Sequence, residues 1–331
     1  MFTSRVPPPS RRSPGLSGRI PLGRVLPAAL ALCLVPACVS TTGGGTADDG
    51  AGDALPAGSA RTASASPVPS ASASPAPSAS ASPPPNSAAP DPDRVLDEAL
   101  RPVASSATGH FSVAVMAEGG TVTAGYGSAK HAYATASIAK AAILATLLLQ
   151  AQDQYRSLSA SERATAKLMI TRSDNDAADT LWTRIGATSG YAAGIERLGL
   201  RETAPGTQGH WGLTQTTAAD QLRLLDALTS SDSPLTASSR AYVADLMGSV
   251  VTGQDWGVSA GADKDAPTRL KNGWMPRSAT GLWVVNSIGV VTHEGRHLLL
   301  AVLSDDQRSL ESGIKLIESA AKAATEAAEK F

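Results

Sequence analysis

The chain has 331 residues, of which 42% are hydrophobic, 17% are charged and only 4% are aromatic. Lys and Arg number 28 and Asp and Glu number 29, and this balance argues against a broad nucleic-acid-binding surface, which would need clustered positive charge. Every aromatic residue except Phe2 lies after residue 92, so residues 93–331 must form the packed core, as one large core or two closely packed lobes.

The N-terminus is typical of an export signal. Several arginines and no acidic residue precede a short apolar segment at 25–37, which is too short to span a bilayer comfortably. The sequence from Leu34 to Cys38, LVPAC, looks like a bacterial lipobox. We therefore predict a signal peptide over residues 1–38, with Cys38 lipidated and at the mature N-terminus. An ordinary cleaved secretory peptide is the alternative, and the export route, general or twin-arginine, stays open.

Residues 39–92 are rich in Ala, Ser and Pro, a composition that buries little apolar surface. We predict a disordered linker that tethers the domain at 93–331. The two cysteines, Cys33 and Cys38, both lie in the signal segment, so the folded domain has no disulfide, thiol nucleophile or Cys-ligated zinc. We expect the protein at the extracellular face of the cell membrane as a lipoprotein, or secreted.

Periodicity predicts the elements of the folded domain in chain order. A helix at 93–105 is followed by strands at 111–117 and 121–126. The predicted helices of the central region are 137–150, 160–170, 177–185, 189–198, 217–228 and 236–247. Two strands, 282–292 and 298–304, and a helix at 310–328 complete the chain. This order differs from a βαβ alternation. It predicts an α+β fold with an antiparallel sheet flanked by the terminal helices and an all-helical subdomain beside it.

Three short motifs occur in a fixed order. Residues 137–140, SIAK, form S-x-x-K at the start of the most apolar helix. Residues 173–175, SDN, lie between two helices, and residues 271–274, KNGW, contain K-x-G before the final strands. Each motif alone is common, but together and in this context they are specific.

The spacing of Ser137 and Lys140 suits nucleophilic catalysis, because residues three apart share one face of a helix. A serine hydroxyl is a poor nucleophile until a neighbour takes its proton. A lysine can do so only as a neutral amine, a state that a low-polarity site or a second cation such as Lys271 favours. Backbone N–H groups at the helix N-terminus would stabilise a developing oxyanion.

These motifs, and the order of elements over essentially all of 93–331, resemble class A β-lactamases and the related penicillin-recognising serine enzymes. The resemblance implies that Ser137 is the nucleophile and Lys140 its base. It also implies that Ser173 passes a proton to the leaving nitrogen and that Asn175 holds the substrate amide.

The same resemblance implies roles for the residues of the third motif. Lys271 would pair with a substrate carboxylate, and Gly273 would let the strand approach closely. The backbone N–H of Trp274 would complete the oxyanion hole. The resemblance implies no metal and no organic cofactor.

Two departures from the family pattern bear on turnover. Asn272 stands where the family usually has Thr or Ser. The family's water-activating glutamate, expected in a Glu-x-x-Leu-Asn stretch after the second motif, is missing, and Gly206–Leu213 occupies that region. Glu202 is the nearest substitute. We therefore expect Ser137 to be acylated and freed slowly.

Each motif also has a plain structural interpretation. Ser137 could be a helix N-cap, Lys140 a surface lysine, Ser173–Asn175 a capping turn and Lys271 a loop charge. The sequence at 293–297, HEGRH, matches the zinc-protease motif H-E-x-x-H, but its central glycine and flanking β-branched strands predict a hairpin, in which the two histidines are not helical neighbours. His210 is expected in a loop, and three tryptophans are expected in the core: Trp182, Trp256 and Trp283.

The sequence thus predicts an exported, monomeric serine hydrolase acting on a small β-lactam or a related amide, with the membrane reached only through Cys38. A peptidoglycan D,D-peptidase or transpeptidase and a non-catalytic binding module of the same fold remain alternatives.

Overall fold

The computed structural model describes residues 90–331, so the predicted signal peptide and nearly all of the predicted linker lie outside the described residues. The first helix begins at Pro92, after an Asp91 cap whose side chain accepts from the N–H of Asp93. Within the described range, no helix is both long and apolar enough to cross a membrane.

Eight α-helices and seven strands make up the described part of the chain. In chain order they are α1 (Pro92–Ser106), β1 (His110–Ala117), β2 (Thr123–Tyr126), β3 (Tyr133–Ala134), α2 (Ala139–Asp153), α3 (Ala160–Thr171), α4 (Asn175–Arg184), α5 (Ala187–Arg197), β4 (Gln215–Thr216), α6 (Ala218–Thr229), α7 (Ala237–Met247), β5 (Arg269–Pro276), β6 (Trp283–His293), β7 (Arg296–Gln307) and α8 (Leu310–Ala328). Short 3₁₀ turns also occur, including Ala136–Ile138 directly before α2.

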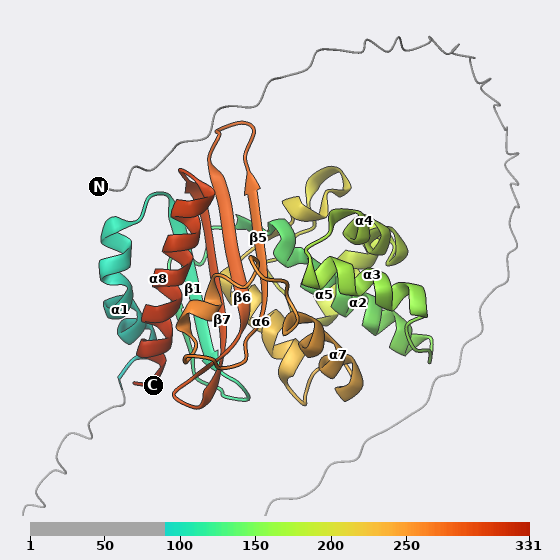
Figure 1. The fold of residues 1–331 in the computed structure, drawn as a ribbon, viewed down its shortest axis with the longest axis horizontal. Coiled ribbons are helices and arrows are strands. Elements are labelled where there is room, and N and C mark those ends of the chain that lie inside the picture. Colours follow the sequence, from blue (N-terminus) through green and yellow to red (C-terminus); the bar gives the residue numbers. More distant parts are fainter. Residues whose placement is uncertain (1–89) are drawn as a thin grey trace, which may run out of the picture. The chain divides into compact units, whose positions relative to one another are not determined.

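A five-stranded antiparallel sheet in the order β2-β1-β7-β6-β5 forms the centre of the domain. Helices α1 and α8 cover one face, and the helices from α2 to α7 lie on the other side (Figure 1). Each side has its own hydrophobic cluster, because the central strands β1, β6 and β7 are apolar on both faces. The predicted α+β architecture with a helical subdomain is confirmed.

Helix α2 lies at the centre of the helical subdomain. Twelve of its 15 residues are buried. A helix that is apolar all round is stable only when other elements surround it. Helices α3, α4, α5 and α7 all contact α2. The start of α2 is therefore held in a fixed place between this subdomain and the sheet.

Three details differ from the sequence prediction. The helix predicted at 137–150 is a 3₁₀ turn followed by α2, which begins at Ala139. The C-terminal third contains three strands, because β5 precedes the two predicted ones. A small two-stranded ladder, β3 with β4, was also not predicted, and it joins the segment before Ser137 to the start of α6. Strand β5 includes Lys, Asn, Gly and Pro, so no apolar alternation marks it in the sequence.

Candidate active site

The first turn of α2 brings Ser137 and Lys140 together. Ser137 lies in the 3₁₀ turn, and Nζ of Lys140 donates to its Oγ at 2.9 Å. The residue before the serine, Ala136, has a φ of 46°, a left-handed conformation that costs energy for a side chain larger than glycine. Such a conformation persists only where the surrounding packing holds it, here at the junction of β3 and α2.

The turn between α3 and α4 supplies the next groups. Lys140 Nζ also donates to the Ser173 carbonyl at 2.6 Å and to Asn175 Oδ1 at 2.8 Å. Ser173 has a φ of 54°. Asp174 caps α4 by accepting from the N–H of Ala177 at 2.8 Å, which fixes the turn.

Strand β5 supplies the second lysine from the opposite side. Lys271 Nζ donates to Ser173 Oγ at 2.9 Å and to the Asn272 carbonyl at 2.8 Å. Ser173 Oγ is also 3.3 Å from Lys140 Nζ, so the hydroxyl lies between the two amines. The fold thus brings all three sequence motifs to one point.

Gly273 is required by the close approach of β5 to the turn that carries Ser137. A Cβ at this position would lie 2.7 Å from the Thr135 carbonyl oxygen and 2.8 Å from the backbone nitrogens of Ser137 and Ile138. These are backbone atoms that cannot rotate away. The predicted role of Gly273 in letting the strand approach closely therefore has a direct steric basis.

Both lysines are removed from solvent, with Lys140 0% and Lys271 1% exposed. Burial lowers the pKa of Lys140 to about 8, against the opposing effect of the Asp174 and Asp179 carboxylates. Burial also lowers the pKa of Lys271 well below its usual range, and the charge of Lys140 adds to this shift. A neutral amine beside Ser137 is thus accessible near neutral pH.

These positions contradict most of the plain structural interpretations. Ser137 does not cap α2, whose N-cap is Ile138 with no side-chain hydrogen bond. Lys140 is buried rather than a surface lysine, and Lys271 is in a strand rather than a loop. The capping interpretation holds for the second motif, through Asp174. Ser173 and Asn175 nonetheless contact Lys140, so the cap and the polar cluster coexist.

Sequence reasoning missed Trp211 and Asp179. The Trp211 ring centroid is 4.7 Å from Nζ of Lys140, within cation–π range. Its indole N–H donates to Asp179 Oδ1 at 2.7 Å, from the first half of α4. The only available signal was an aromatic residue in the region where the family's glutamate was expected, and its contacts could not be read from the sequence.

Glu202, the nearest candidate for the missing glutamate, is engaged elsewhere. Its carboxylate accepts from the hydroxyl of Thr217, the N-cap of α6, at 2.8 Å. Nearby, the buried carboxylate of Asp220 accepts from the N–H groups of Arg201 and Glu202 at 3.0 and 2.7 Å. This network anchors the start of the loop that carries Trp211. Among contacts within residues 90–331, no carboxylate hydrogen-bonds to Ser137.

The side chain of Asn272, which replaces the family's hydroxyl residue, points away from Ser173. Its Nδ2 donates to the carbonyls of Gln254 and Trp256 at 3.0 and 2.8 Å. Successive residues of a strand face opposite sides, so Trp274, two residues on, lies on the same face as Asn272. The Trp274 ring packs edge-on against Trp256 at 5.8 Å. This contact concerns only the side chain, so the oxyanion-hole role of the Trp274 backbone N–H stays a prediction.

The segment matching H-E-x-x-H forms the β6–β7 hairpin, as predicted. His293 pairs with Arg296 across the turn and hydrogen-bonds to Glu329, whereas His297 hydrogen-bonds to Glu118. The two imidazoles therefore have separate partners. His210 lies in a loop between short turns. Of the three tryptophans expected in the core, Trp182 is buried and the others, Trp256 and Trp283, are partly buried.

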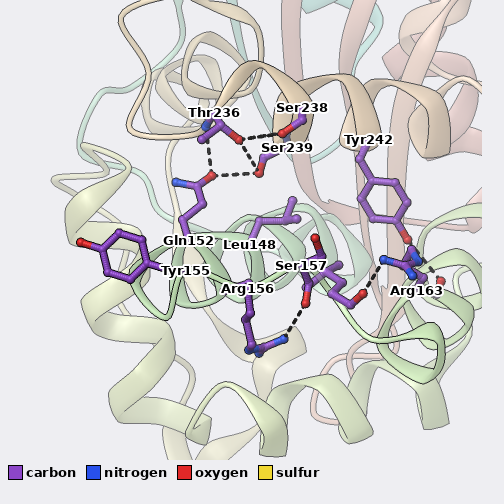
Figure 2. Close-up of a pocket in the computed structure, with 12 residues that line it drawn as sticks. Leu148, Gln152, Tyr155, Arg156, Ser157, Arg163, Thr236, Ser238, Ser239 and Tyr242 are labelled. Atoms are coloured by element: carbon purple, nitrogen blue, oxygen red, sulfur yellow. Dashed lines mark hydrogen bonds between the residues drawn. The ribbon is translucent and has the colours of Figure 1, made fainter.

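A hollow of about 670 Å³ lies away from these residues, between the end of α2, the start of α3 and α7 (Figure 2). Its polar groups largely bond to one another. Gln152 Oε1 accepts from the N–H of Thr236 at 3.0 Å and from the hydroxyl of Ser239 at 2.8 Å. The hollow contains none of the predicted site residues, and we assign it no chemistry.

Comparison with known proteins relates the chain to a family. A family model described as the Beta-lactamase enzyme family matches residues 159–328. The match includes the second and third motifs and begins after the first. LppW of Mycobacterium tuberculosis (strain ATCC 25618 / H37Rv), whose name designates it a candidate lipoprotein, is 31% identical over 215 residues, covering 63% of this chain and 67% of LppW.

Solved structures share the fold. A class A β-lactamase from Bacteroides cellulosilyticus DSM 14838 aligns with a TM-score of 0.63 at 16% identity, covering 73% of this chain and 100% of the other. A PBP-A variant, solved as an acyl-enzyme complex with penicillin G, aligns with a TM-score of 0.60 at 19% identity, covering 72% and 97%. At these identities the likeness is one of fold.

Proposed function

Because the chain belongs to the beta-lactamase enzyme family, we propose that it is a serine hydrolase acylated at Ser137 by a β-lactam or a related amide. The observation that carries the proposal is the convergence of Ser137, Lys140, Ser173 and Lys271 within one hydrogen-bonded cluster. A nucleophile, a base with a lowered pKa and a proton-transfer group are thereby present together.

The acylation step follows from the contacts. Neutral Lys140 takes the proton from Ser137 Oγ, which attacks the lactam carbonyl carbon to form an ester bond. The ring carbon–nitrogen bond breaks, and the nitrogen receives a proton through the Ser173 hydroxyl, which lies between the two lysines. The ring opens without losing a fragment, so the adduct carries the full mass of the antibiotic.

The other predicted residues would hold the substrate. Asn175 is tied to Lys140 through its Oδ1, which leaves its amide N–H₂ to meet a substrate carbonyl. Lys271 would attract a substrate carboxylate, whose negative charge raises the pKa of the ammonium again. The N–H groups of Ser137 and Trp274 would stabilise the oxyanion.

We also propose slow deacylation. Hydrolysis of an acyl-enzyme requires a base that activates water, and Glu202 is hydrogen-bonded to Thr217 instead. The Trp211 indole packs over Lys140 from the loop where the family's glutamate was expected. The indole ring supplies no base for the activation of water.

We also propose that the protein is exported and carries a lipid anchor on Cys38. The name of LppW designates a candidate lipoprotein, and this relationship supports an exported, membrane-anchored protein. Incorporation of labelled fatty acid into the wild type but not into Cys38→Ala would test the anchor. Labelling of both the wild type and the variant, or of neither, would contradict the proposed anchor.

Intact-protein mass spectrometry after mixing with benzylpenicillin tests the catalytic proposal. We expect a persistent adduct on the wild type and none on Ser137→Ala. No adduct with unchanged antibiotic would overturn the proposal in favour of a binding module. No adduct with hydrolysed antibiotic would refute slow deacylation but keep the hydrolase.

A D,D-peptidase is the second candidate, favoured by the fold shared with a penicillin-acylated PBP-A and by the absence of a carboxylate on Ser137 among the described contacts. Release of D-alanine from a model peptide ending in D-Ala-D-Ala separates the two. Release by the wild type and not by Ser137→Ala would establish the peptidase.

A further inference from the structure

We propose that His110, His131 and Asp305 form a binding site for a divalent transition-metal ion, with zinc as the best fit. The site lies apart from the cluster around Ser137, and its existence does not depend on the proposed function. Among residues 90–331, this is the one group of three His, Cys, Asp or Glu side chains whose ligand atoms all lie within 4.8 Å of one another.

The three ligands come from different parts of the fold. His110 begins β1 and pairs across the sheet with Asp305 of β7. His131 lies in the connection between β2 and β3. Its Nε2 is 2.8 Å from Asp305 Oδ2, whereas Nδ1 of His110 is 3.0 Å from Asp305 Oδ1. Each carboxylate oxygen therefore faces a different imidazole nitrogen.

These two separations are hydrogen-bond distances, a few tenths of an ångström shorter than the spacing of ligand atoms around a shared metal. Ligand atoms bound to zinc at about 2.0–2.2 Å in a tetrahedron lie roughly 3.3–3.6 Å apart. Small outward movements of the two rings would open that space. A second carboxylate, Asp306 Oδ2, is 3.5 Å from His110 Nδ1 and could supply a fourth ligand. Two imidazoles with carboxylates favour zinc over magnesium or calcium, which prefer oxygen alone.

Among the described contacts, hydrogen bonds account for Asp305 and the two imidazoles, but not for the Asp306 carboxylate. Two carboxylates approach the same nitrogen of His110, which can donate only one proton, so Asp305 and Asp306 compete for it. The two imidazole rings lie side by side, tilted by 34° with their centroids 4.5 Å apart, so both face the same small space. One dication satisfies all four groups.

The backbone holds the ligands in place before any metal binds. Asp306 has a φ of 54°, and Gly109, next to His110, has a φ of 79°. A Cβ on Gly109 would lie 2.2 Å from the Asp305 carbonyl oxygen, so only glycine allows the two segments to approach this closely. The His131 ring makes an edge-to-face contact with the ring of the buried Tyr133, which orients the imidazole.

The site is accessible. The His110 side chain is 59% exposed and that of His131 is 30% exposed. A hollow of about 250 Å³ lies beside the two rings, large enough for water in an open coordination position. A bound metal would join β1, β7 and the segment that continues through β3 to Ser137, and would thereby stabilise the approach to the active site.

Isothermal titration of the metal-stripped protein with ZnCl₂ tests the proposal. We expect one zinc per chain, and a rise in melting temperature of about 5 °C at a zinc concentration hundredfold above Kd. His110→Ala, at an exposed position that tolerates truncation, should weaken binding at least about tenfold. His131→Ala and Asp305→Asn should do the same.

His297→Ala is the matched control, because His297 also faces a carboxylate, Glu118 at 2.8 Å, but no third ligand lies nearby among residues 90–331. It should bind zinc like the wild type. Cobalt binding adds a readout of geometry, since tetrahedral Co²⁺ with nitrogen ligands has a visible absorption band. No zinc uptake at about 100 μM, or equal loss in His297→Ala and His110→Ala, would overturn the proposal.

Discussion

Lys140 should set the pH dependence of acylation. The amine accepts the serine proton only when it is neutral, and burial lowers its pKa to about 8. The neutral fraction is then about one-tenth at pH 7 and about nine-tenths at pH 9. The second-order rate constant of acylation should therefore rise about tenfold between these pH values and level off above them. An unperturbed lysine would still be mostly charged at pH 9.

Two nearby carboxylates raise the pKa of Lys140, so neutralising one of them by mutation should lower that pKa. Asp179→Asn removes one negative charge but keeps an oxygen for the Trp211 indole N–H, so the ring should stay in place. The midpoint of the pH profile should move to lower pH. Asp176→Asn is the matched control, because Asp176 is an exposed acid of the same helix that does not contribute to the shift.

Stopped-flow acylation by a chromogenic β-lactam, measured from pH 6 to pH 10, provides the profile. Lys140→Arg stays charged throughout this range and should acylate at no pH. A rate constant that is flat or falls as the pH rises would refute the assignment of Lys140 as the base. An unchanged midpoint in Asp179→Asn would refute the electrostatic account of its pKa.

Three further predictions concern single positions. Gly273→Ala should slow acylation at least about tenfold and lower the free energy of unfolding in urea by about 1–3 kcal/mol, because the added Cβ meets backbone atoms within 2.8 Å. The control Gly125→Ala, which has open space around it, should change neither quantity. Lys271→Met should raise the melting temperature at pH 7, because the folded-state pKa of Lys271 lies below its unfolded value and charging the amine in the fold costs energy. The gain in melting temperature should vanish above about pH 10.5, where the lysine is neutral in both states. A gain independent of pH would contradict this account. Trp211→Glu should shorten the lifetime of the penicillin adduct, because it places a carboxylate near Lys140, whereas Trp211→Gln should not. Mass spectrometry measures these lifetimes. Equal lifetimes of the two variants would show that a missing base does not limit deacylation.

Features that depend on short-range spacing could be predicted from the amino-acid sequence. The last helix has the predicted bounds, 310–328, and begins after a Ser309 cap whose hydroxyl accepts from the N–H of Ser312. Ser137 and Lys140 meet because they are three residues apart at the start of a helix. These interactions lie within one or two turns of chain, so local sequence suffices to predict them.

Which distant groups share a site depends on how remote segments pack, and local sequence patterns did not predict it. Lys271 contacts a hydroxyl 98 residues away, and the strand that carries it is defined by pairing with β6 rather than by its own pattern. Trp211 reaches Lys140, and His131 reaches Asp305, from segments without regular periodicity. The lowered pKa of each lysine likewise requires burial, which depends on how the helical subdomain packs against the sheet. Packing between remote segments carries no local signature, and it alone places the second lysine, the indole and the imidazole–carboxylate cluster.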